Sequence, residues 1–512
     1  MDLKYIQQIA IELSLPVKNI NNVQQMHTEG ATIPFISRYR KEATGNMDEV
    51  QVGNVIDKIK YYDELEKRKE TVLKTIEAAG KLTPELKLRI ENCLNATELE
   101  DIYLPYKPKR KTKATVAIEK GLEPLAQLLF DQSQPVSDEQ IATYLNEQVK
   151  DNADALQGAR DIIAEWISES EPARTTVRSI FQETSAISAR VLTTKKESEE
   201  AQKYRDYFEF KEPLADCPSH RLLAIRRGEK EGFLIMDIGV EKESAIGELK
   251  NVFVKTSNSA AEQVALATED AYSRLLKPAI ETEFRMSSKT AADEEAIRVF
   301  AENLRQLLLA SPLGSKRVLA IDPGFRTGCK VVCLDESGTF LKYTTIFPHP
   351  PQNDWSGAAA TLKELVSRYE IEAIGYGNGT ASKETEKLVR GIDFGRPVSI
   401  FMVNESGASI YSASEVAREE FPDEDVTVRG AISIGRRLLD PLSELVKIDA
   451  KSIGVGQYQH DVNQNRLKDS LDNVVQSCVN YVGVDVNTAS KHLLTYVSGL
   501  TATTAKNIVE YR

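Results

Sequence analysis

One stretch, residues 317–328, constrains the fold of this 512-residue chain more than any other. An apolar run leads to Asp322, and Pro323 and Gly324 follow it at once. This order predicts a buried strand that ends on a carboxylate, with a tight turn that leaves the carboxylate open to a ligand. Alternating apolar residues resume after the turn and break at Asp335–Gly338. The stretch therefore predicts three consecutive strands, of which the second and third form a hairpin.

Two broad classes of protein begin a domain in this way: two-metal nucleases with an RNase H-like sheet, and phosphate-binding ATPases related to actin and sugar kinases. After the three strands, helices predicted at 358–369, 382–389 and 412–420 alternate with strands at 371–376 and 398–403. This order predicts a mixed sheet covered by helices, which suits the RNase H-like fold. An actin-like ATPase needs a second Asp-x-Gly loop after a strand. The sequence shows none, so the ATPase class is the minor alternative.

The remainder of the chain has mostly helical patterns. Gly30 and Pro34 interrupt an early helical pattern, which suits the short helices of a helix-turn-helix-like unit. The charged stretch 190–212 predicts a long exposed helix. The expected fold class is a multidomain α protein with an α/β part. The expected domains are a helical N-terminal region at 1–205, a helical and mixed connecting region at 206–312, an RNase H-like mixed sheet at 316–450 and a C-terminal helix-hairpin-helix region at 451–512.

Composition argues against several classes of protein. No apolar run is long enough to cross a bilayer and the N-terminus lacks the pattern of a signal peptide, so a cytoplasmic protein without membrane contact is expected. The five cysteines are scattered, which indicates reduced thiols. None of the five histidines lies in a metalloprotease or triad motif, so histidine catalysis is not expected. The net charge of −12 disfavours a wholly electrostatic nucleic-acid binder but permits local basic patches.

Three acids are candidates for a catalytic metal site: Asp322, Glu405 and Asp440. Glu405 follows a later predicted strand, and Asp440 lies on a predicted helix that could lean over the sheet edge. A nuclease of the RNase H kind needs several carboxylates around divalent ions, and Mg2+ or Mn2+ prefers such oxygen ligands. Asn378 stands where another acid would complete the set. Each acid also has a structural explanation, a turn for Asp322 and an N-cap before Pro441 for Asp440.

Two segments are candidates for contacts with nucleic-acid phosphates. The first is a basic loop, which is equally compatible with a solvated connector. The second is a helix–turn–helix pattern centred on a glycine, whose backbone amides can bind phosphate without reading base sequence. Its alternative is a plain helical hairpin. The candidate residues are Lys107, Lys109, Arg110, Lys111, Lys113, Ser498, Gly499, Leu500, Thr501, Lys506 and Arg512.

Several long motifs resemble the Tex family of bacterial transcription accessory proteins, and the resemblance covers essentially the whole chain. The motifs are TIPFISRYRKEATG at 32–45, DIYLPYKPKR at 101–110, YRDYF at 204–208, ESGASIYSAS at 405–414 and GVGQYQHDV at 454–462. The resemblance implies a helical N-terminal region with a helix-turn-helix-like part, an RNase H-like domain of the YqgF type, helix-hairpin-helix motifs and an S1 RNA-binding domain. It also implies that Asp322, Glu405 and Asp440 match acids of a YqgF domain without demonstrated nuclease chemistry.

The chain departs from the family pattern after residue 512, where a second helix-hairpin-helix motif and the S1 domain are missing. A truncated hairpin region is therefore expected, with an uncovered apolar helical face in 485–512. Strong binding of single-stranded RNA is less expected without the stacking aromatics of an S1 barrel.

These patterns predict a transcription accessory factor, not primarily an enzyme, that binds single-stranded RNA and DNA or structured nucleic acid through sequence-independent backbone contacts. Two alternatives stay open. One is a metal-dependent RNase H-like nuclease or resolvase, which would use Mg2+ or Mn2+, and the other is a protein scaffold for RNA polymerase or ribosomal partners. Binding alone requires no cofactor.

Overall fold

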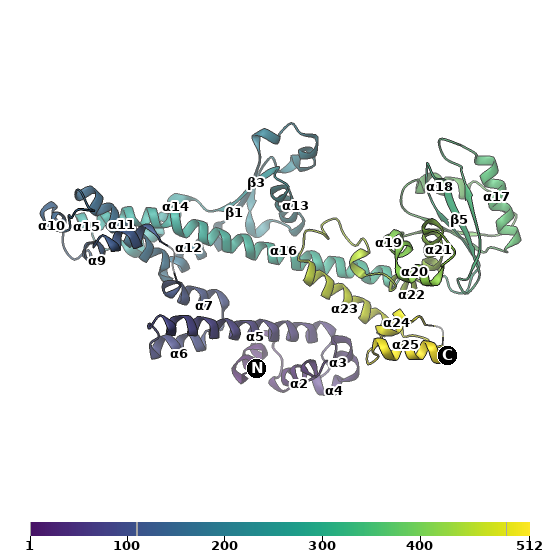
Figure 1. Ribbon diagram of the computed structural model, residues 1–512, viewed down its shortest axis with the longest axis horizontal. Coiled ribbons are helices and arrows are strands. Elements are labelled where there is room, and N and C mark those ends of the chain that lie inside the picture. Colours follow the sequence, from purple (N-terminus) through teal and green to yellow (C-terminus); the bar gives the residue numbers. More distant parts are fainter. Residues whose placement is uncertain (1, 109–110, 488) are drawn as a thin grey trace. The chain divides into compact units, whose positions relative to one another are not determined.

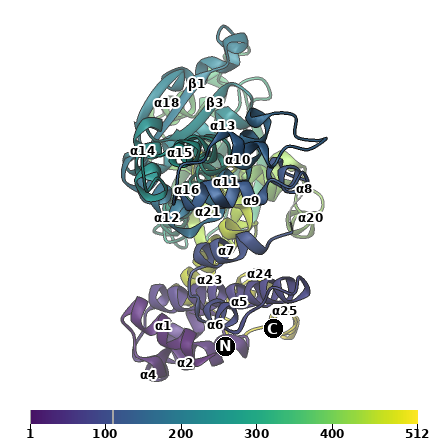
Figure 2. The same cartoon turned by 90° about the vertical axis from the view of Figure 1, so that its left-hand side faces the viewer.

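The computed structural model of the chain describes residues 2–108, 111–487 and 489–512. Figure 1 shows its helices and strands along the chain, and Figure 2 shows the same ribbon from a second direction. The contacts between residues separate into two compact units. Helices, a mixed sheet and a C-terminal helix-hairpin-helix are all present, so the predicted fold class is confirmed.

The first unit comprises residues up to 24 together with 53–294, and the second comprises 25–52 together with 295–512. Three helices contribute residues to both units, because the boundaries fall inside them. They are α2 (Val17–Thr28), α5 (Glu49–Ala78) and α16 (Lys277–Leu308).

Most of the first unit consists of helices packed around an apolar core, to which α9, α11, α12 and α15 contribute fully buried side chains. Polar residues start several of these helices; the Ser170 hydroxyl, for example, accepts a hydrogen bond from the Ala173 amide at the start of α12. The helices are α1 (Leu3–Leu13), α6 (Pro84–Asn92), α7 (Ala96–Tyr103), α8 (Lys113–Glu119), α9 (Glu123–Asp131), α10 (Asp138–Ala142), α11 (Asn152–Glu169), α12 (Glu171–Thr184), α13 (Ser219–Lys230), α14 (Lys242–Phe253) and α15 (Ser259–Asp270).

A small antiparallel sheet in the first unit has the strand order β2-β1-β3. Its strands are β1 (Ala186–Val191), β2 (Glu209–Pro213) and β3 (Leu234–Gly239). β1 and β3 lie side by side in both Figure 1 and Figure 2. The sheet joins residues on both sides of position 205, where the sequence suggested a domain boundary.

The long helix predicted at 190–212 is wrong. The structure has short 3-10 turns at Thr193–Lys195 and Glu199–Tyr207, and then β2. The turns bury only Ala201 and Tyr204, which is too narrow an apolar face to hold a long helix against a core. In β2 the exposure alternates from residue to residue, a period of two that the surrounding charges concealed.

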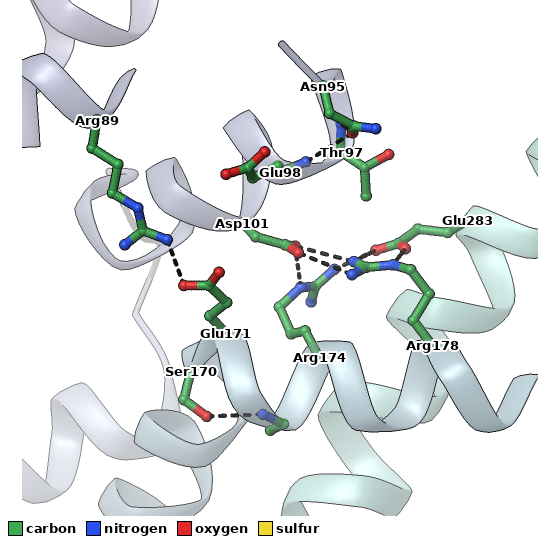
Figure 3. A network of polar contacts seen from close by, with 11 residues as sticks. Arg89, Asn95, Thr97, Glu98, Asp101, Ser170, Glu171, Arg174, Arg178 and Glu283 are labelled. Carbon is green, nitrogen blue, oxygen red and sulfur yellow. Dashed lines mark hydrogen bonds and ion pairs between the residues drawn. The ribbon is translucent and has the colours of Figure 1, made fainter. Parts of the chain in front are cut away.

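A buried ion network ties three helices of the first unit together (Figure 3). Asp101 on α7 accepts from Arg174 on α12 at 2.6 Å and from Arg178, one turn further along α12, at 3.0 Å. Both arginines also contact Glu283 on α16. The side chains of Asp101 and Arg174 are only 7% and 10% exposed, so each charge depends on its partners for the hydration it has lost.

The second unit contains a five-stranded sheet of order β6-β5-β4-β7-β8. β4 pairs antiparallel with β5 and parallel with β7. This order and these directions are those of an RNase H-like sheet, as predicted. The strands are β4 (Val318–Asp322), β5 (Cys329–Leu334), β6 (Phe340–Ile346), β7 (Ala373–Gly377) and β8 (Ser399–Val403).

Helices cover both faces of this sheet. Leu319 and Ile321 of β4 pack with α17 and α18, whereas Val318 and Ala320 pack with α21 on the opposite face. The helix predicted at 412–420 is instead two short helices, because Ser414 leaves the helical conformation and caps the second of them. The helices are α17 (Trp355–Arg368), α18 (Ser382–Arg390), α19 (Ala408–Ala413), α20 (Glu415–Glu420), α21 (Val426–Leu439) and α22 (Pro441–Leu445).

The remaining helices of the second unit are α3 (Ile33–Tyr39), α4 (Lys41–Thr44), α23 (Gln464–Val482), α24 (Lys491–Thr495) and α25 (Ala502–Tyr511). α3 docks on α23 through Arg38, which donates to Glu49 at 2.8 Å and to the Ser477 carbonyl at 3.1 Å. Short helices around Gly30 and Pro34 therefore form as predicted. Among the helices of residues 2–108, 111–487 and 489–512, none combines the length and hydropathy needed to span a bilayer.

We expect Asp101→Ala to lower the free energy of unfolding of the first unit by roughly 3 to 5 kcal/mol, because it leaves two arginines in low solvent exposure without their shared carboxylate. Glu171→Ala is the matched control. It removes the Arg89–Glu171 pair beside the network in Figure 3, and that pair is about half exposed, so a loss below about 1 kcal/mol is expected. Urea unfolding followed by Trp166 in a Trp355→Phe background measures both. Equal losses of unfolding free energy in the two variants would contradict a larger contribution from the buried network than from the exposed pair.

Candidate functional site

The carboxylate predicted at the strand tip lies at the end of β4. Asp322 is opposite Lys330 of β5 in the strand register, and one of its oxygens faces Gly430 in the second turn of α21. Burial raises the pKa of the Asp322 carboxyl to about 6 from an ordinary 3.8. The nearby charge of Glu405 adds to this rise, and Lys330 opposes it. Asp322 is thus a half-buried acid that titrates close to neutrality.

Glu405 lies beside Asp322 because two glycines make room for it. A Cβ added at Gly377 or Gly379 would overlap the Glu405 carboxylate, so only glycine at these positions permits its placement. Between them, Asn378 accepts a hydrogen bond from the Glu405 amide at 3.1 Å. The Glu405 Oε2 atom is buried and has no hydrogen-bond partner within the described residues. An unpaired buried carboxylate oxygen is the natural partner of a cation or of a donor on a ligand.

Two basic residues support this acidic pair from outside. Arg437 on α21 donates through Nη1 to the carbonyls of Asn404 and Ser406, which flank Glu405, at 2.9 and 2.7 Å. Lys330 donates through Nζ to the carbonyls of the turn that follows Asp322. Arg437 and Lys330 therefore fix the two loops that carry the acids, and the charge of Lys330 acts on Asp322 while that of Arg437 lies near Glu405.

The third candidate acid is not brought to this pair. Asp440 follows the last residue of α21 and caps α22, accepting from the Ser443 amide at 3.0 Å. Asp322 faces Gly430, and ten residues of α-helix span about 15 Å. Arg436, in the last turn of α21, reaches the β5–β6 hairpin at Gly338, which lies at the opposite end of β5 from Lys330. The capping explanation that the sequence offered for Asp440 thus matches its placement.

Cation-binding chemistry at this site rests on two carboxylates. No group of three or more Asp, Glu, His or Cys side chains suited to a metal ion exists among the residues that the structure describes. The donor set present is Asp322, the unpaired Oε2 of Glu405 and the amide oxygen of Asn378, which is already used by the Glu405 amide. Such a set fits one hard divalent cation such as Mg2+ or Mn2+, with water completing its shell.

The glycine hairpin forms between α24 and α25, with Gly499 at φ +92°. Asn480 of α23 anchors it, since its side chain donates to the Tyr496 carbonyl at 2.8 Å and accepts from the Ser498 amide at 2.9 Å. The Leu500 amide donates to the Val497 carbonyl. Two of the predicted phosphate-binding amides, those of Ser498 and Leu500, are therefore occupied within the hairpin itself.

The hairpin still presents unpaired donors. Thr501 caps α25 by accepting from the Thr504 amide at 3.1 Å, which leaves the first-turn amides ahead of it unused. In the hairpin segment 498–504, no acceptor among the described residues is found for the backbone amides of Gly499, Thr501, Ala502 and Thr503. They cluster at the positive end of a ten-residue helix, which suits an anion.

The predicted cationic contacts around the hairpin are in different situations. Lys506 is exposed, and its ion pair among the described residues is with Glu510, one turn further along α25. Arg512 donates to the carbonyls of Val486 and Ala489, so it stabilises the hairpin's own backbone. Lys506 remains available for a phosphate, whereas Arg512 is committed to the fold.

The basic loop lies in the first unit, between α7 and α8. Lys107 and Lys113 are exposed, and Lys111 forms an exposed ion pair with Glu119 at 3.5 Å. Lys109 and Arg110 lie outside the described residues. The loop is followed by a capping box in which Thr112 and Thr115 bond each other's backbones, so its C-terminal end is fixed against α8.

Comparison with known proteins matches most of the chain to domains of one family, together with a helix-hairpin-helix motif. Four family models match the chain: Tex-like protein N-terminal domain at 3–77, Tex central region-like at 132–300, Tex protein YqgF-like domain at 316–439 and helix-hairpin-helix motif at 479–512. The Bacillus subtilis protein YdcI is 46% identical over 99% of this chain and 71% of its own length. Transcriptional accessory protein Tex of Neisseria gonorrhoeae is 46% identical over 98% of this chain and 67% of its own length.

The chain belongs to the Tex family. A human relative, S1 RNA-binding domain-containing protein 1, is 34% identical over 96% of this chain and 51% of its own length. The chain thus spans between about half and about seven tenths of these relatives. The resemblance to Tex proteins predicted from the sequence motifs is confirmed.

The sequence did not predict the residues that hold Glu405 in place or the residue that anchors the glycine hairpin. Asn378 was noted only as a missing acid, although its flanking glycines after a strand signal a close approach of another group. Arg437 is only 5% exposed, and nothing in the sequence around it signals that a charged side chain would be buried there. Asn480 has no sequence signal, because its role depends on a hairpin sixteen residues further along.

Because the pKa of Asp322 is raised, the free energies of unfolding of wild type and Asp322→Asn should differ by an amount that depends on pH. Folded Asp322 keeps its proton up to about pH 6, whereas the unfolded chain releases it near pH 3.8, so this carboxyl destabilises the folded domain increasingly between those values. Wild type should lose up to about 3 kcal/mol relative to Asp322→Asn over this window, and the difference should level off above it. Urea unfolding followed by Trp355 in a Trp166→Phe background measures it. A pH-independent difference would contradict the burial of this acid.

Proposed function

We propose that this Tex-family chain is a nucleic-acid-binding accessory factor of transcription that holds the nucleic-acid backbone without reading its sequence. The observation that carries the proposal is the set of unpaired amides at Gly499 and the start of α25, with Lys506 nearby. Amides at a helix N-terminus bind phosphate oxygens and are indifferent to the bases. The names of relatives, a transcriptional accessory protein and an S1 RNA-binding domain protein, agree with it.

Binding by this route must be local, because the chain as a whole carries a net charge of −12. The fixed partial charges of four amides and a few lysines neutralise few phosphates, which predicts weak affinity with a moderate salt slope. Single-stranded RNA, single-stranded DNA and structured nucleic acid all expose the backbone that such a site recognises. RNA polymerase or the ribosome enters this proposal only indirectly, as a complex that contains the nucleic acid to which the chain binds.

Ala502→Pro is a direct test of the hairpin. Proline is well tolerated at the first position of a helix, and Thr501 before it already has an extended conformation, so the substitution deletes one amide hydrogen while α25 is kept. We expect affinity for a fluorescein-labelled 20-nucleotide oligouridylate to fall about three- to tenfold, roughly the net value of one ordinary hydrogen bond. Fluorescence anisotropy at several salt concentrations measures it.

Ala502→Ser is the matched control, since it keeps the amide and should bind like wild type. Wild-type affinity should also fall as salt rises, with the same slope for RNA and DNA of equal length. Salt-independent binding, or equal binding by Ala502→Pro and wild type, would contradict backbone recognition by this hairpin.

A second candidate function rests on Asp322 and Glu405. The unpaired, buried Oε2 of Glu405 beside a second carboxylate favours cation binding, and we propose one divalent ion held by these two acids. An ion held there would polarise a phosphoryl oxygen and lower the pKa of a bound water. The chain's own contribution is to keep both acids in place, through Gly377, Gly379 and Arg437.

Mn2+ should stabilise the wild-type domain against unfolding, by about 2.7 kcal/mol at one hundred times its dissociation constant. Asp322→Asn and Glu405→Gln should abolish the effect. Asp440→Asn should retain it, because that residue caps α22 and lies at the other end of α21. Thermal unfolding followed by Trp355 gives the answer without any assay of activity.

The same variants, incubated with branched DNA and with RNA, then test hydrolysis. Mn2+-dependent cleavage that Asp322→Asn abolishes would establish a nuclease. Stabilisation without cleavage would assign the ion a structural role, and the absence of both would end the metal proposal while leaving the hairpin proposal intact.

A further inference from the structure

The outer edge of β8 is an unprotected strand edge. β8 is the last strand of its sheet and pairs only with β7 among the described strands. Natural sheets usually shield such edges with charged side chains, proline or a bulge. β8 reads Ser-Ile-Phe-Met-Val and has none of these, and Phe401 and Met402 are 37% and 64% exposed. Both large apolar side chains therefore remain in water although they follow each other on an edge strand.

A cavity of about 210 Å3 opens beside this edge. Phe401 and Met402 form one wall, and Leu438, Leu445 and Ile453 supply much of the apolar remainder. Pockets for whole cofactors or drug-sized ligands run to roughly 300–1,000 Å3. The cavity is too small for such a ligand but can admit one apolar side chain.

One buried cation also lines this cavity. Arg437 is 5% exposed, and its Nη1 is used by the loop around Glu405. Its Nε has no acceptor within the described residues, and Arg437 is among the residues that line the cavity. A buried guanidinium nitrogen without an acceptor costs stability, which an incoming hydrogen-bond acceptor would recover.

The charges around Arg437 select the kind of acceptor. Burial lowers the pKa of the Arg437 guanidinium, and the nearby charges of Glu444 and Glu405 oppose that shift, so two acids already lie close to this cation. A further carboxylate or phosphate would meet two acids of its own sign. A neutral acceptor, such as a backbone carbonyl, avoids that repulsion.

We propose that β8 and this cavity form a docking site for an extended, apolar peptide segment of a protein partner. The segment adds as a sixth strand along β8, inserts one aliphatic side chain into the cavity and offers a neutral carbonyl toward Arg437. Strand addition uses main-chain hydrogen bonds for affinity and side-chain pockets for selectivity. β8 offers a strand edge without a second neighbour among the described strands for the first, and the cavity offers one pocket for the second. The site is separate from the hairpin and does not depend on nucleic-acid binding.

A nucleic acid is the less suitable occupant of this surface. The lining is mainly apolar, and the one cation in it is buried and lies close to two acids. Phosphates would need exposed cations or free helix-terminal amides, which the cavity walls do not contribute. The peptide is therefore the occupant that the chemistry favours.

The test uses the full chain and a fluorescein-labelled heptapeptide, Thr-Val-Thr-Leu-Thr-Val-Thr, in fluorescence anisotropy. Saturable binding is expected. Met402→Lys, which charges the exposed edge, and Ser311→Trp, which fills the cavity from an exposed position at its rim, should each weaken binding at least tenfold. Leu341→Lys is the control, because Leu341 is an exposed residue of β6, the opposite edge strand, and should leave binding unchanged.

Two peptide variants separate strand addition from simple apolar contact. Replacing the central leucine by aspartate should abolish binding through the cavity, and N-methylation of alternate amides on one edge should abolish the main-chain pairing. Failure of the parent peptide to bind, or equal binding to wild type and Met402→Lys, would overturn the proposal. A wild-type chain that forms a dimer in sedimentation, which Met402→Lys dissociates, would also overturn it by identifying a second copy as the occupant.

Discussion

The close approach of α21 to β4 is the contact on which the second unit depends. Gly435 of α21 lies against Ala320 and Leu334, and a Cβ there would overlap the Leu334 side chain. The helix lies along the sheet from Asp322 at one end to the β5–β6 hairpin at the other. The position of α21 therefore places Gly430 beside Asp322, and it places Arg437 against the loop that carries Glu405.

The same packing keeps Asp322 and Glu405 near each other although their carboxylates repel. The half-buried Asp322 carboxylate loses hydration and is also repelled by the charge of Glu405, and these two effects raise its pKa. Lys330 offsets part of that cost at Asp322, and Arg437 attracts Glu405; both cations are held in position by backbone carbonyls. Since these cations bind carbonyls and not the carboxylates themselves, the Glu405 Oε2 is left without a partner. The site is therefore held in place but not neutralised, which is the condition for binding a cation or a donor.

The sequence predicted well what depends on local order. The order Asp322, Pro323, Gly324 predicted where the strand ends, and the succession of strands and helices predicted the fold of the sheet. Both succeed because hydrophobic periodicity and turn residues are signals that a few neighbouring positions carry. It failed where tertiary contacts decide. The stretch 190–212 has helix-forming charges, yet Phe210 and its neighbours alternate in exposure and pair with β1. Asp440 looked equivalent to Asp322 and Glu405 because the sequence does not show at which end of α21 an acid will meet the sheet.

The hairpin shows how a binding surface and a structural element share one set of donors. Asn480 takes the Ser498 amide and the Tyr496 carbonyl, so the turn holds its shape without a ligand. What remains for a ligand is the group of amides that no intrachain acceptor can reach, at Gly499 and the first turn of α25. Those donors are fixed before binding and lose little conformational freedom when a phosphate arrives. A chain with a net charge of −12 can therefore hold an anion at this place, since fixed dipoles a few ångströms away outweigh distant charges that salt screens.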